Sequence, residues 1–558
     1  MKTIVLLILL IGSFKLLAGD GIDWSRSYTI PKDGRWNPYL LSESDFVKFR
    51  ENGRLHTLVW PVEITGILLP YKPIKSFIES ETRNPLRKVL AKIFQSLSNV
   101  KSMDQIYDWM GLNSFPKEHY EEPFVVPYPT NQPKDIPMGL GLIERDGAKG
   151  FTFSCATCHS ANLFGSKIIG LTNRFPRAND TFINGQKAAS ITPSLMFKAS
   201  TGATSAERRM FKKSKEALKY VGVKSPQVLG LDTSLAQVAI SLSKRAKDQH
   251  ASLVKKNRRS PRNEKLRKFV ADSKPMAWWT LKYKNRWLAD GSVVSGNPIL
   301  TNILWNELGR GTNLIELEKW IDRNMLKIKE LTTASFSAEP PQITNFYSWS
   351  FLDLNSAKRG QKLFKNNCKK CHGIYNKAWD NDEIVGLSIS ELIQTTSVDY
   401  PQPTKVKNVG TDPNRWQGMK SLVQLNELKI SNKYGIVIET QEGYVPPPLV
   451  GIWARWPYFH NNSIPNLCAL LSLPENRPAR FWMGEAINTE TDFDFNCNGY
   501  PVGENTPSKW KKNKDYLYDT TRKGMSNSGH SKVLKNWAGG EKFSPQNKQD
   551  LIRFLQTL

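Results

Sequence analysis

Two pairs of cysteines, each followed at once by a histidine, are the residues of this chain whose spacing can do chemistry. The first pattern reads CATCH and comprises Cys155, Cys158 and His159. The second reads CKKCH and comprises Cys368, Cys371 and His372. Two thiols three positions apart can reach the two vinyl groups of one porphyrin, and the adjacent histidine then lies beneath the ring as an iron ligand. The repeated pattern therefore predicts two covalently bound c-type haems.

The same spacing is also compatible with a structural zinc site, a thioredoxin-like redox pair or coincidence. A zinc site usually takes four ligands from paired knuckles, and coincidence would have to occur twice in a chain with six cysteines. The pattern therefore favours haem attachment. Of the two remaining cysteines, Cys468 and Cys497, the sequence does not say whether they form a disulfide or stay as buried free thiols.

The first 18 residues are typical of a secretory signal peptide. A lysine at position 2 precedes an apolar run over residues 4–11, and small residues follow at positions 18 and 19. Lys15 interrupts the run and no second apolar span follows, so we expect no transmembrane span after signal removal. Because c-type haem is normally attached outside the cytoplasm, we expect a periplasmic or secreted protein.

The chain is strongly basic, with 78 Lys and Arg against 51 Asp and Glu and a net charge of +27. Such a field attracts anionic partners. The densest basic run, residues 255–268, contains no aromatic residue on which a base could stack. Together with the predicted export, this argues against nucleic acid as a partner and favours a solvated loop or helix face.

The order of patterns predicts a mainly α fold with two cytochrome c-like haem domains, long loop-rich insertions and an N-terminal wrapping segment. We expect residues 19–150 to be an N-terminal extension that packs on the first haem domain, which covers residues 151–331. Residues 332–349 contain two consecutive prolines and are predicted to be a linker. The second haem domain then covers residues 350–558.

Several helices can be predicted within this frame. Apolar periodicity indicates a helix over residues 85–97, a helical basic stretch over 205–268 and an amphipathic helix over 314–331. In the second haem domain, Asn355 and Ser356 can cap a helix that runs into Cys368, and Ser544 with Pro545 can begin a C-terminal helix. One helix before the haem motif and one at the terminus is the layout of a cytochrome c domain. The residues between them form a large insertion.

Two adjacent tryptophans, Trp278 and Trp279, open an aromatic and basic stretch that ends at Trp287. One possibility is that both pack in the core. The other is that one of them lies between the haems or over the open face of the first haem, where it would shape the distal pocket or carry electrons. We therefore treat both as candidate catalytic residues.

Three further stretches carry a resemblance to a known family. They are GTDPNR at residues 410–415, GIWARWPYFHNNSIPNL at 451–467 and MSNSGH at 525–530. With the two cysteine motifs they resemble the di-haem cytochrome c peroxidase superfamily, and most of all its rubber oxygenase-like branch. The resemblance covers the second haem domain well, the first mainly around residues 155–175 and 278–290, and the first hundred residues hardly at all.

The resemblance implies a division of labour between two irons. One haem with an open distal side would bind hydrogen peroxide or dioxygen, and the other, with two protein ligands, would relay electrons. Peroxidases of the superfamily supply a methionine ligand from the helix after Pro-Tyr-Phe-His, but residues 464–473 here contain none. In the rubber oxygenase-like branch the ligand resembles the histidine of the later block, here His530. We therefore expect His372 and His530 to hold the second haem, with Met525 as the alternative.

The same resemblance suggests roles for three more residues. His460 would be a hydrogen-bonding residue near a haem propionate rather than a ligand, or else a structural histidine. Arg415 and Arg455 could pair with propionates, because a guanidinium matches a carboxylate with two hydrogen bonds, or could be ordinary surface arginines. A calcium ion between domains is familiar from the peroxidases, but the sequence assigns no residues to it.

These patterns together predict an exported di-haem oxidoreductase that acts on dioxygen or hydrogen peroxide. Its partner would be a small redox protein, such as a cytochrome or cupredoxin, or an apolar organic substrate. The alternative is an electron-transfer protein without turnover, in which His56, His119, His250 or a methionine before residue 332 closes the first haem. The sequence does not determine the substrate, the electron donor or the oligomeric state.

Overall fold

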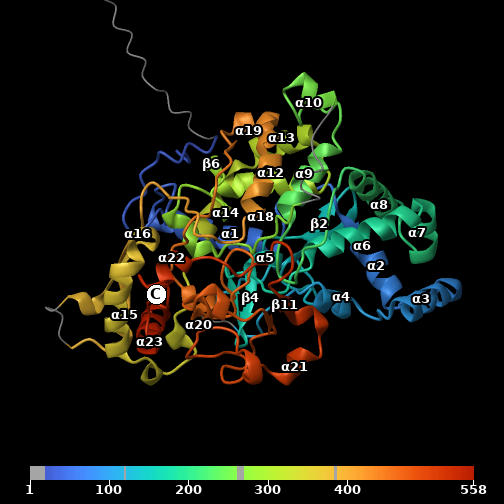
Figure 1. The fold of residues 1–558 in the computed structure, drawn as a ribbon. Coiled ribbons are helices and arrows are strands. Elements are labelled where there is room, and N and C mark those ends of the chain that lie inside the picture. Colours follow the sequence, from blue (N-terminus) through green and yellow to red (C-terminus); the bar gives the residue numbers. More distant parts are fainter. Residues whose placement is uncertain (1–18, 119–120, 260–268, 382–385) are drawn as a thin grey trace, which may run out of the picture.

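The computed structural model describes residues 19–118, 121–259, 269–381 and 386–558. The predicted signal peptide, His119 and most of the basic run after Arg259 lie outside these residues. The structure contains both helices and strands, and more of it is helical (Figure 1). The prediction of a mainly α fold is therefore confirmed in part. In the part of the chain that the structure describes, no helix is both long enough and apolar enough to cross a bilayer.

The helices, in chain order, are α1 (Glu43–Leu58), α2 (Tyr71–Ile78), α3 (Pro85–Ser98), α4 (Met103–Trp109), α5 (Ala156–His159), α6 (Ala178–Ile191), α7 (Ser194–Thr201), α8 (Ser205–Leu218), α9 (Ser234–Ser243), α10 (Lys255–Arg259), α12 (Pro298–Gly309), α13 (Leu314–Arg323), α14 (Met325–Phe336), α15 (Leu354–Asn367), α16 (Lys369–His372), α17 (Ile389–Leu392), α18 (Asn414–Gly418), α19 (Lys429–Lys433), α20 (Leu467–Leu470), α21 (Ser508–Lys511), α22 (Ser531–Leu534) and α23 (Pro545–Gln556). A 3-10 helix, η1, covers Trp278–Tyr283.

Within the described residues, the strands form five small antiparallel sheets. They are β1 (Leu69–Pro70), β2 (Leu140–Arg145) and β3 (Ala148–Phe153) in the order β1-β3-β2, then the pairs β4 (Ser160–Leu163) with β5 (Ser166–Ile169), β6 (Val293–Ser295) with β9 (Val437–Ile438), β7 (Ile374–Lys377) with β8 (Thr395–Asp399), and β10 (Arg480–Trp482) with β11 (Leu517–Asp519).

The second cysteine motif has the predicted helical surroundings. Helix α15 leads into Cys368, and the C-terminal helix α23 is capped by Ser544, whose side chain accepts a hydrogen bond from the amide of Asn547. The predicted cap of α15 is wrong by two residues, because Asp353 rather than Asn355 or Ser356 caps it. Helices α15 and α23 cross closely and lie side by side in Figure 1.

The first cysteine motif does not repeat this layout. It follows strand β3 of the hairpin β2–β3, so no long helix precedes it. Asp146 and Gly147 both have positive φ at the hairpin tip, which is the conformation that Asp-Gly favours in a two-residue turn. This Asp-Gly pair between alternating apolar residues is a local signal from which the hairpin could have been predicted. Among the described residues, the predicted pair of helices, α15 and α23, therefore accompanies the second motif and not the first.

The two large hydrophobic cores do not follow the predicted division of the chain. The core built mainly from residues 24–338 also contains eight buried residues between positions 419 and 438, and strand β6 pairs there with β9. The other core, built mainly from residues 343–558, also takes in buried residues of the β4–β5 hairpin. Each half of the sequence thus completes the core of the other.

Other predicted elements are found with changed limits. Helix α3 matches the expected 85–97, whereas the stretch 205–268 breaks into α8, α9 and α10. The amphipathic stretch 314–331 is divided at Asn324 into α13 and α14, and α14 continues to Phe336. The first residues of the predicted linker 332–349 therefore belong to a buried helix. Ile343, also within the predicted linker, is fully buried in the core built mainly from residues 343–558.

The crossing of α15 and α23 depends on Gly360. A Cβ atom at this position would lie 1.9 Å from the carbonyl oxygen of Asp550, so the two helices would have to separate. We expect Gly360→Ala to lower the free energy of unfolding by about 1–3 kcal/mol. Gly185→Ala in α6 is the matched control, because nothing lies within 4 Å of its added Cβ, and we expect a gain of about 0.5–1 kcal/mol there. Urea unfolding measures both, and equal effects would contradict the close crossing.

Candidate functional site

Both cysteine motifs open onto one cavity of about 530 Å³. The motif residues that line it are Cys155, Cys158, His159, Cys368, Cys371 and His372, and His530 lines it as well. Most other lining residues are apolar or aromatic, and they come from both cores. The tertiary structure therefore brings together two motifs that are about two hundred residues apart in the sequence.

At the first motif, helix α5 is a single turn that places His159 on the cavity wall. The amide of His159 donates to the carbonyl of Cys155 at 2.9 Å, which closes this turn. Burial lowers the pKa of His159 to about 4, so its imidazole is neutral at physiological pH. The ring of Trp278 lies 5.4 Å from that of His159 between centroids. A neutral imidazole of this kind can serve as a metal ligand.

At the second motif, the main chain orients the imidazole of His372. Its Nδ1 donates to the carbonyl oxygen of Pro447 at 3.0 Å, which leaves Nε2 unprotonated and free to bind a metal. Burial lowers the pKa of His372, so that ring is also neutral at physiological pH. Pro447 lies in a segment that no local pattern connects with the motif.

His530 lies opposite His372 across the cavity. The two rings are nearly parallel, with planes 12° apart and centroids 6.4 Å apart. With metal–nitrogen bonds of roughly 2.0–2.1 Å and a ring centre about 1.1 Å behind each nitrogen, one metal between two imidazoles separates their centres by about 6.3 Å. The observed spacing thus fits one metal ion between these histidines.

The surroundings of His530 hold it in this position. The residue has a positive φ of 64°, and its amide donates to the carbonyl of Val409 at 2.9 Å. The ring of Phe459 stacks on the imidazole with centroids 5.4 Å apart. Burial, with smaller effects of His372 and Arg477, lowers the pKa of His530 to about 3. Its Nδ1 is buried without a partner, which is consistent with a group missing from the site.

The alternative ligand Met525 lies elsewhere. Its sulfur accepts a hydrogen bond from the Tyr518 hydroxyl at 3.2 Å, and the side chain is fully buried away from the cavity lining. The structure therefore places His530, and not Met525, opposite His372.

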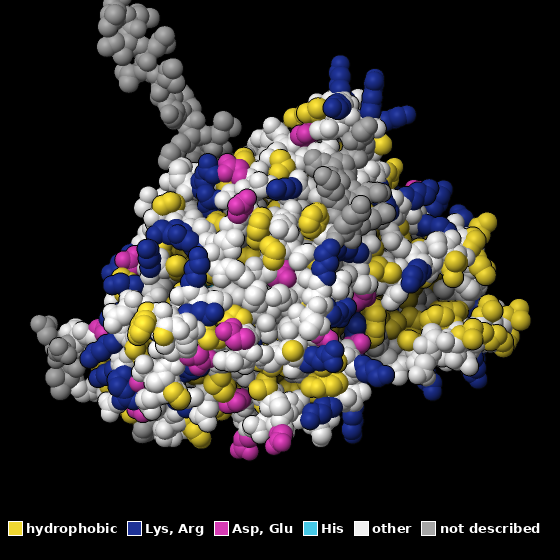
Figure 2. All heavy atoms as spheres, in the orientation of Figure 1, with side chains coloured by type: hydrophobic (Ala, Val, Ile, Leu, Met, Phe, Trp, Pro, Cys, Tyr) yellow, Lys and Arg dark blue, Asp and Glu magenta, His cyan; other side chains and the backbone are white. Residues whose placement is uncertain are grey.

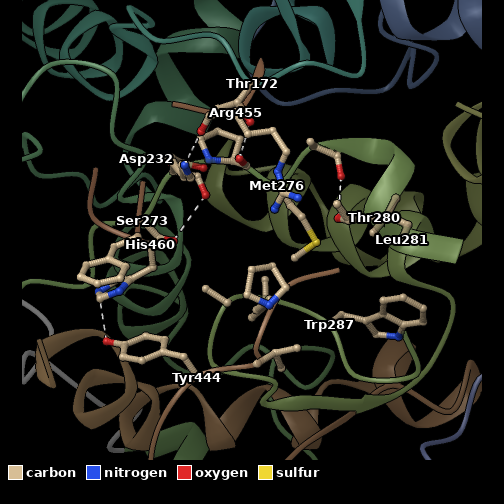
Figure 3. A pocket seen from close by; sticks show the side chains of 18 of the residues that line it. Thr172, Asp232, Ser273, Met276, Thr280, Leu281, Trp287, Tyr444, Arg455 and His460 are labelled. Carbon is tan, nitrogen blue, oxygen red and sulfur yellow. Dashed lines mark hydrogen bonds between the residues drawn. The ribbon is translucent and has the colours of Figure 1, made fainter. Parts of the chain in front are cut away.

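His460 lines the cavity and forms a pair with Tyr444 (Figure 3). The two rings stack with centroids 4.1 Å apart, and His460 Nε2 lies 3.0 Å from the Tyr444 hydroxyl. Because that hydroxyl donates to the Asp412 carbonyl, it accepts from the imidazole. Burial lowers the pKa of His460 well below its usual range. His460 therefore sits in a hydrogen-bonded pair at the cavity wall, and its contact with a propionate stays a prediction.

Buried cations without carboxylate partners surround the cavity. Arg455 donates to the carbonyl oxygens of Pro448 and Val450, and Lys284 donates to the sulfur of Met276. Among the described residues, neither cation has an Asp or Glu within 4.0 Å. Figure 3 shows Arg455 and Met276 facing the same space. A buried charge without a counterion is costly, so these two groups indicate an anionic ligand in the cavity.

Arg415 also lines the cavity, but its charge has a partner within the protein. Its expected pairing with a propionate stays a prediction. Arg415 is buried and forms an ion pair with Asp290, with Nε and Oδ2 3.0 Å apart, and it also donates to the carbonyl of Ala271. Its charge is thus already balanced within the protein.

The two candidate tryptophans face different cores. Trp278 lines the cavity beside His159. Trp279 is fully buried in the core of residues 343–558, where its indole donates to the carbonyl of Val450 at 2.9 Å, and it does not line the cavity. The expectation that Trp279 takes part in the chemistry is therefore not supported by its position, whereas Trp278 remains a candidate.

The other described histidines proposed as ligands of the first haem lie beside glutamate side chains instead. His56 Nε2 lies 2.9 Å from a carboxylate oxygen of Glu330, and His250 Nε2 lies 3.5 Å from one of Glu318. Neither lines the cavity, and His119 falls outside the described residues. Met276, in contrast, does line it.

The geometry does not resemble a zinc site or a redox disulfide. Within residues 19–118, 121–259, 269–381 and 386–558, no three His, Cys, Asp or Glu side chains converge on a metal-sized space, and this also gives no support to the expected calcium. None of the four motif cysteines is in a disulfide, and burial raises the pKa of the Cys155 and Cys368 thiols to about 12. The residues present therefore fit covalently held haem best.

Sequence reasoning missed several lining residues because nothing in the sequence sets them apart. Lys284, Tyr444 and Pro447 are examples.

Comparison with known proteins finds a family match for the segment around His460. A family described as RoxA-like, cytochrome c-like matches residues 443–482, which include Tyr444, Pro447 and Arg455. Two curated relatives come from Sinorhizobium fredii (strain NBRC 101917 / NGR234). Uncharacterized protein y4iJ is 25% identical over 259 residues, and Uncharacterized protein y4iM is 27% identical over 223 residues.

The aligned regions cover 37% of this chain in both cases, and they span 39% of y4iJ and 49% of y4iM. The chain thus matches less than half the length of either relative. The family match supports a relationship to RoxA-like cytochromes c and, with it, covalently bound haem. Both the family match and the residues that line the cavity are consistent with a c-type cytochrome.

The two remaining cysteines form a disulfide, which settles the alternative that the sequence left open. Cys468 and Cys497 are bonded, and Cys468 lies in α20, whose Leu467 and Leu470 line the cavity. The disulfide therefore ties one cavity wall to a distant loop.

Removing this disulfide should destabilise the protein. Because the bond joins residues 29 positions apart, we expect the Cys468→Ala, Cys497→Ala double variant to lose about 3–4 kcal/mol of unfolding free energy. Chemical unfolding measures the loss, and mass spectrometry of the alkylated wild-type protein verifies that the bond exists. An unchanged unfolding midpoint would contradict a structural role.

Proposed function

We propose that this chain is an exported di-haem c-type cytochrome that acts as an oxidoreductase on dioxygen or hydrogen peroxide. The observation that carries the proposal is an asymmetry between the two motifs. His372 faces the parallel imidazole of His530, whereas among the described residues no second imidazole lies parallel to that of His159. Two ligands would saturate one iron, and one ligand would leave the other iron open to a small molecule.

At the first motif, Cys155 and Cys158 would attach the haem and His159 would hold its iron from one side. When bound, this haem supplies iron that can activate dioxygen or peroxide. Trp278 limits the space beside His159, and the surrounding apolar residues exclude water. Burial lowers the pKa of Lys284 to about 7, so its Nζ can both hold and release a proton at neutral pH.

At the second motif, Cys368 and Cys371 would attach the other haem, with His372 and His530 as the two iron ligands. The carbonyl of Pro447 and the ring of Phe459 keep these two imidazoles parallel. A haem closed on both sides is suited to electron transfer rather than to binding a substrate. It would exchange electrons with a small redox protein, such as a cytochrome or cupredoxin.

The organic substrate, where one is used, would be apolar. The cavity wall near the first motif carries apolar side chains such as Ile299, Ile303 and Leu281. The family match to RoxA-like cytochromes c supports the same hypothesis. Export to the periplasm or beyond agrees with the disulfide between Cys468 and Cys497, because such bonds persist in oxidising compartments.

Absorption and paramagnetic resonance spectra test the proposal. We expect one low-spin and one high-spin haem per chain, with carbon monoxide binding to one haem after dithionite reduction. In His530→Ala the low-spin signal should disappear and a second carbon monoxide should bind. His250→Ala is the control, because His250 pairs with Glu318 outside the cavity lining and its loss should leave the spectra unchanged.

Mixing the reduced protein with dioxygen or with hydrogen peroxide then separates the two reactions. Two low-spin haems that bind no added ligand in either oxidation state would overturn the proposal and leave a non-catalytic electron carrier.

The charge of Lys284 should also affect one haem. Removing a cation near a haem favours the more positive, oxidised iron, so Lys284→Met should lower the midpoint potential of that haem. Lys282→Met is the matched control, because Lys282 pairs with Glu339 and does not line the cavity. Spectroelectrochemical titration measures both variants. An equal effect of the two substitutions would contradict a specific role of Lys284 in the cavity.

A further inference from the structure

Helix α3 presents an apolar stripe to solvent. The stripe comprises Leu86, Val89, Leu90, Ile93 and Leu97. These positions follow the 3.6-residue period of one helix face, and Leu86 and Leu97 are 76% and 84% exposed. Ala91 is the one residue of this helix that is buried. Helix α3 thus lies on the outside of the molecule with its apolar face uncovered.

The neighbouring segment extends this surface. Ile191 at the end of α6 is 80% exposed, and Leu195 and Met196 in α7 are also exposed. Arg87 of α3 donates to the carbonyl of Ala199 in α7, which ties the two helices together. Figure 2 shows the resulting group of hydrophobic side chains at one end of the molecule, over α3 and α7 as labelled in Figure 1. We call these eight side chains the α3–α7 patch.

Four lysines lie in the helices that carry the patch. Lys88 and Lys92 in α3, Lys187 in α6 and Lys198 in α7 are all exposed. Residues 85–98 and 181–206 contain no Asp or Glu. The whole chain carries a net charge of +27, so its long-range field has the same sign. An apolar stripe with a cationic rim complements a surface that is apolar inside and anionic outside.

We infer that the α3–α7 patch docks on the surface of a bilayer that contains anionic lipids. The apolar stripe would enter the boundary between headgroups and acyl chains, and the lysines would contact the phosphates. A second copy of the chain fits less well, because two patches face to face would bring their lysine rims together. This inference does not depend on the proposed redox function.

Vesicle co-sedimentation of the full-length protein tests the inference. Binding to vesicles of phosphatidylglycerol and phosphatidylcholine should exceed binding to phosphatidylcholine alone, and it should weaken at high salt. Leu90→Ser with Leu97→Ser should reduce the binding at least about tenfold, and Lys88→Gln with Lys92→Gln should reduce it about 10- to 30-fold. All four side chains are exposed, so the variants should fold, which the haem absorption spectrum verifies.

Trp537→Ser is the matched control. Trp537 is 99% exposed and follows α22, which Figure 1 places far from α3, so its loss should not change binding. Equal binding to both kinds of vesicle, or full binding by the Leu90→Ser, Leu97→Ser variant, would overturn the inference. So would a dimer, detected by light scattering, that the same double variant abolishes, because the patch would then be a contact between two copies.

Discussion

The structure depends on one constraint: two hydrophobic cores must close around a shared cavity, and the four cysteines of the two motifs line that cavity. Neither core can do so with contiguous sequence. The segment of residues 419–438 completes the core of the N-terminal half, and the β4–β5 hairpin after the first motif packs into the core of the C-terminal half. The exchange explains why the chain has long insertions rather than two compact haem domains in succession.

The electrostatics of the cavity follow from this enclosure. Burial keeps the imidazoles of His159, His372 and His530 neutral, which suits them as metal ligands. The same burial leaves Arg455 and Lys284 with no carboxylate partner among the described residues. Arg415, which pairs with Asp290, shows how the fold treats a buried cation that the protein balances by itself. The unbalanced cations and the neutral imidazoles therefore indicate the same thing, an anionic metal-bearing group.

The cavity and the α3–α7 patch lie in different parts of the molecule. The cavity lies where the cores meet, while α3 and α7 project from the N-terminal half with few contacts to either core. Their apolar residues are not required for folding around the cavity, since most of them are exposed. A surface of this kind determines where the protein is held rather than what it does chemically.

The sequence by itself predicted covalently bound haem, because each of the two Cys-x-x-Cys-His motifs places two thiols and a histidine within five residues. It also predicted the local elements with strong signals, such as α3, α15 and α23, since helix periodicity and capping are properties of neighbouring residues. The hairpin before the first motif was missed although Asp146 and Gly147 marked its turn.

Only the tertiary structure decided which distant residues face the motifs. Contacts between segments far apart in the chain place His530, and not Met525, opposite His372. Such contacts also make Pro447 the acceptor for His372 and bring Trp278, and not Trp279, to the cavity. The pairing of Cys468 with Cys497 was open for the same reason. Such contacts arise from the packing of the two cores against each other, and no local pattern of residue types encodes that packing.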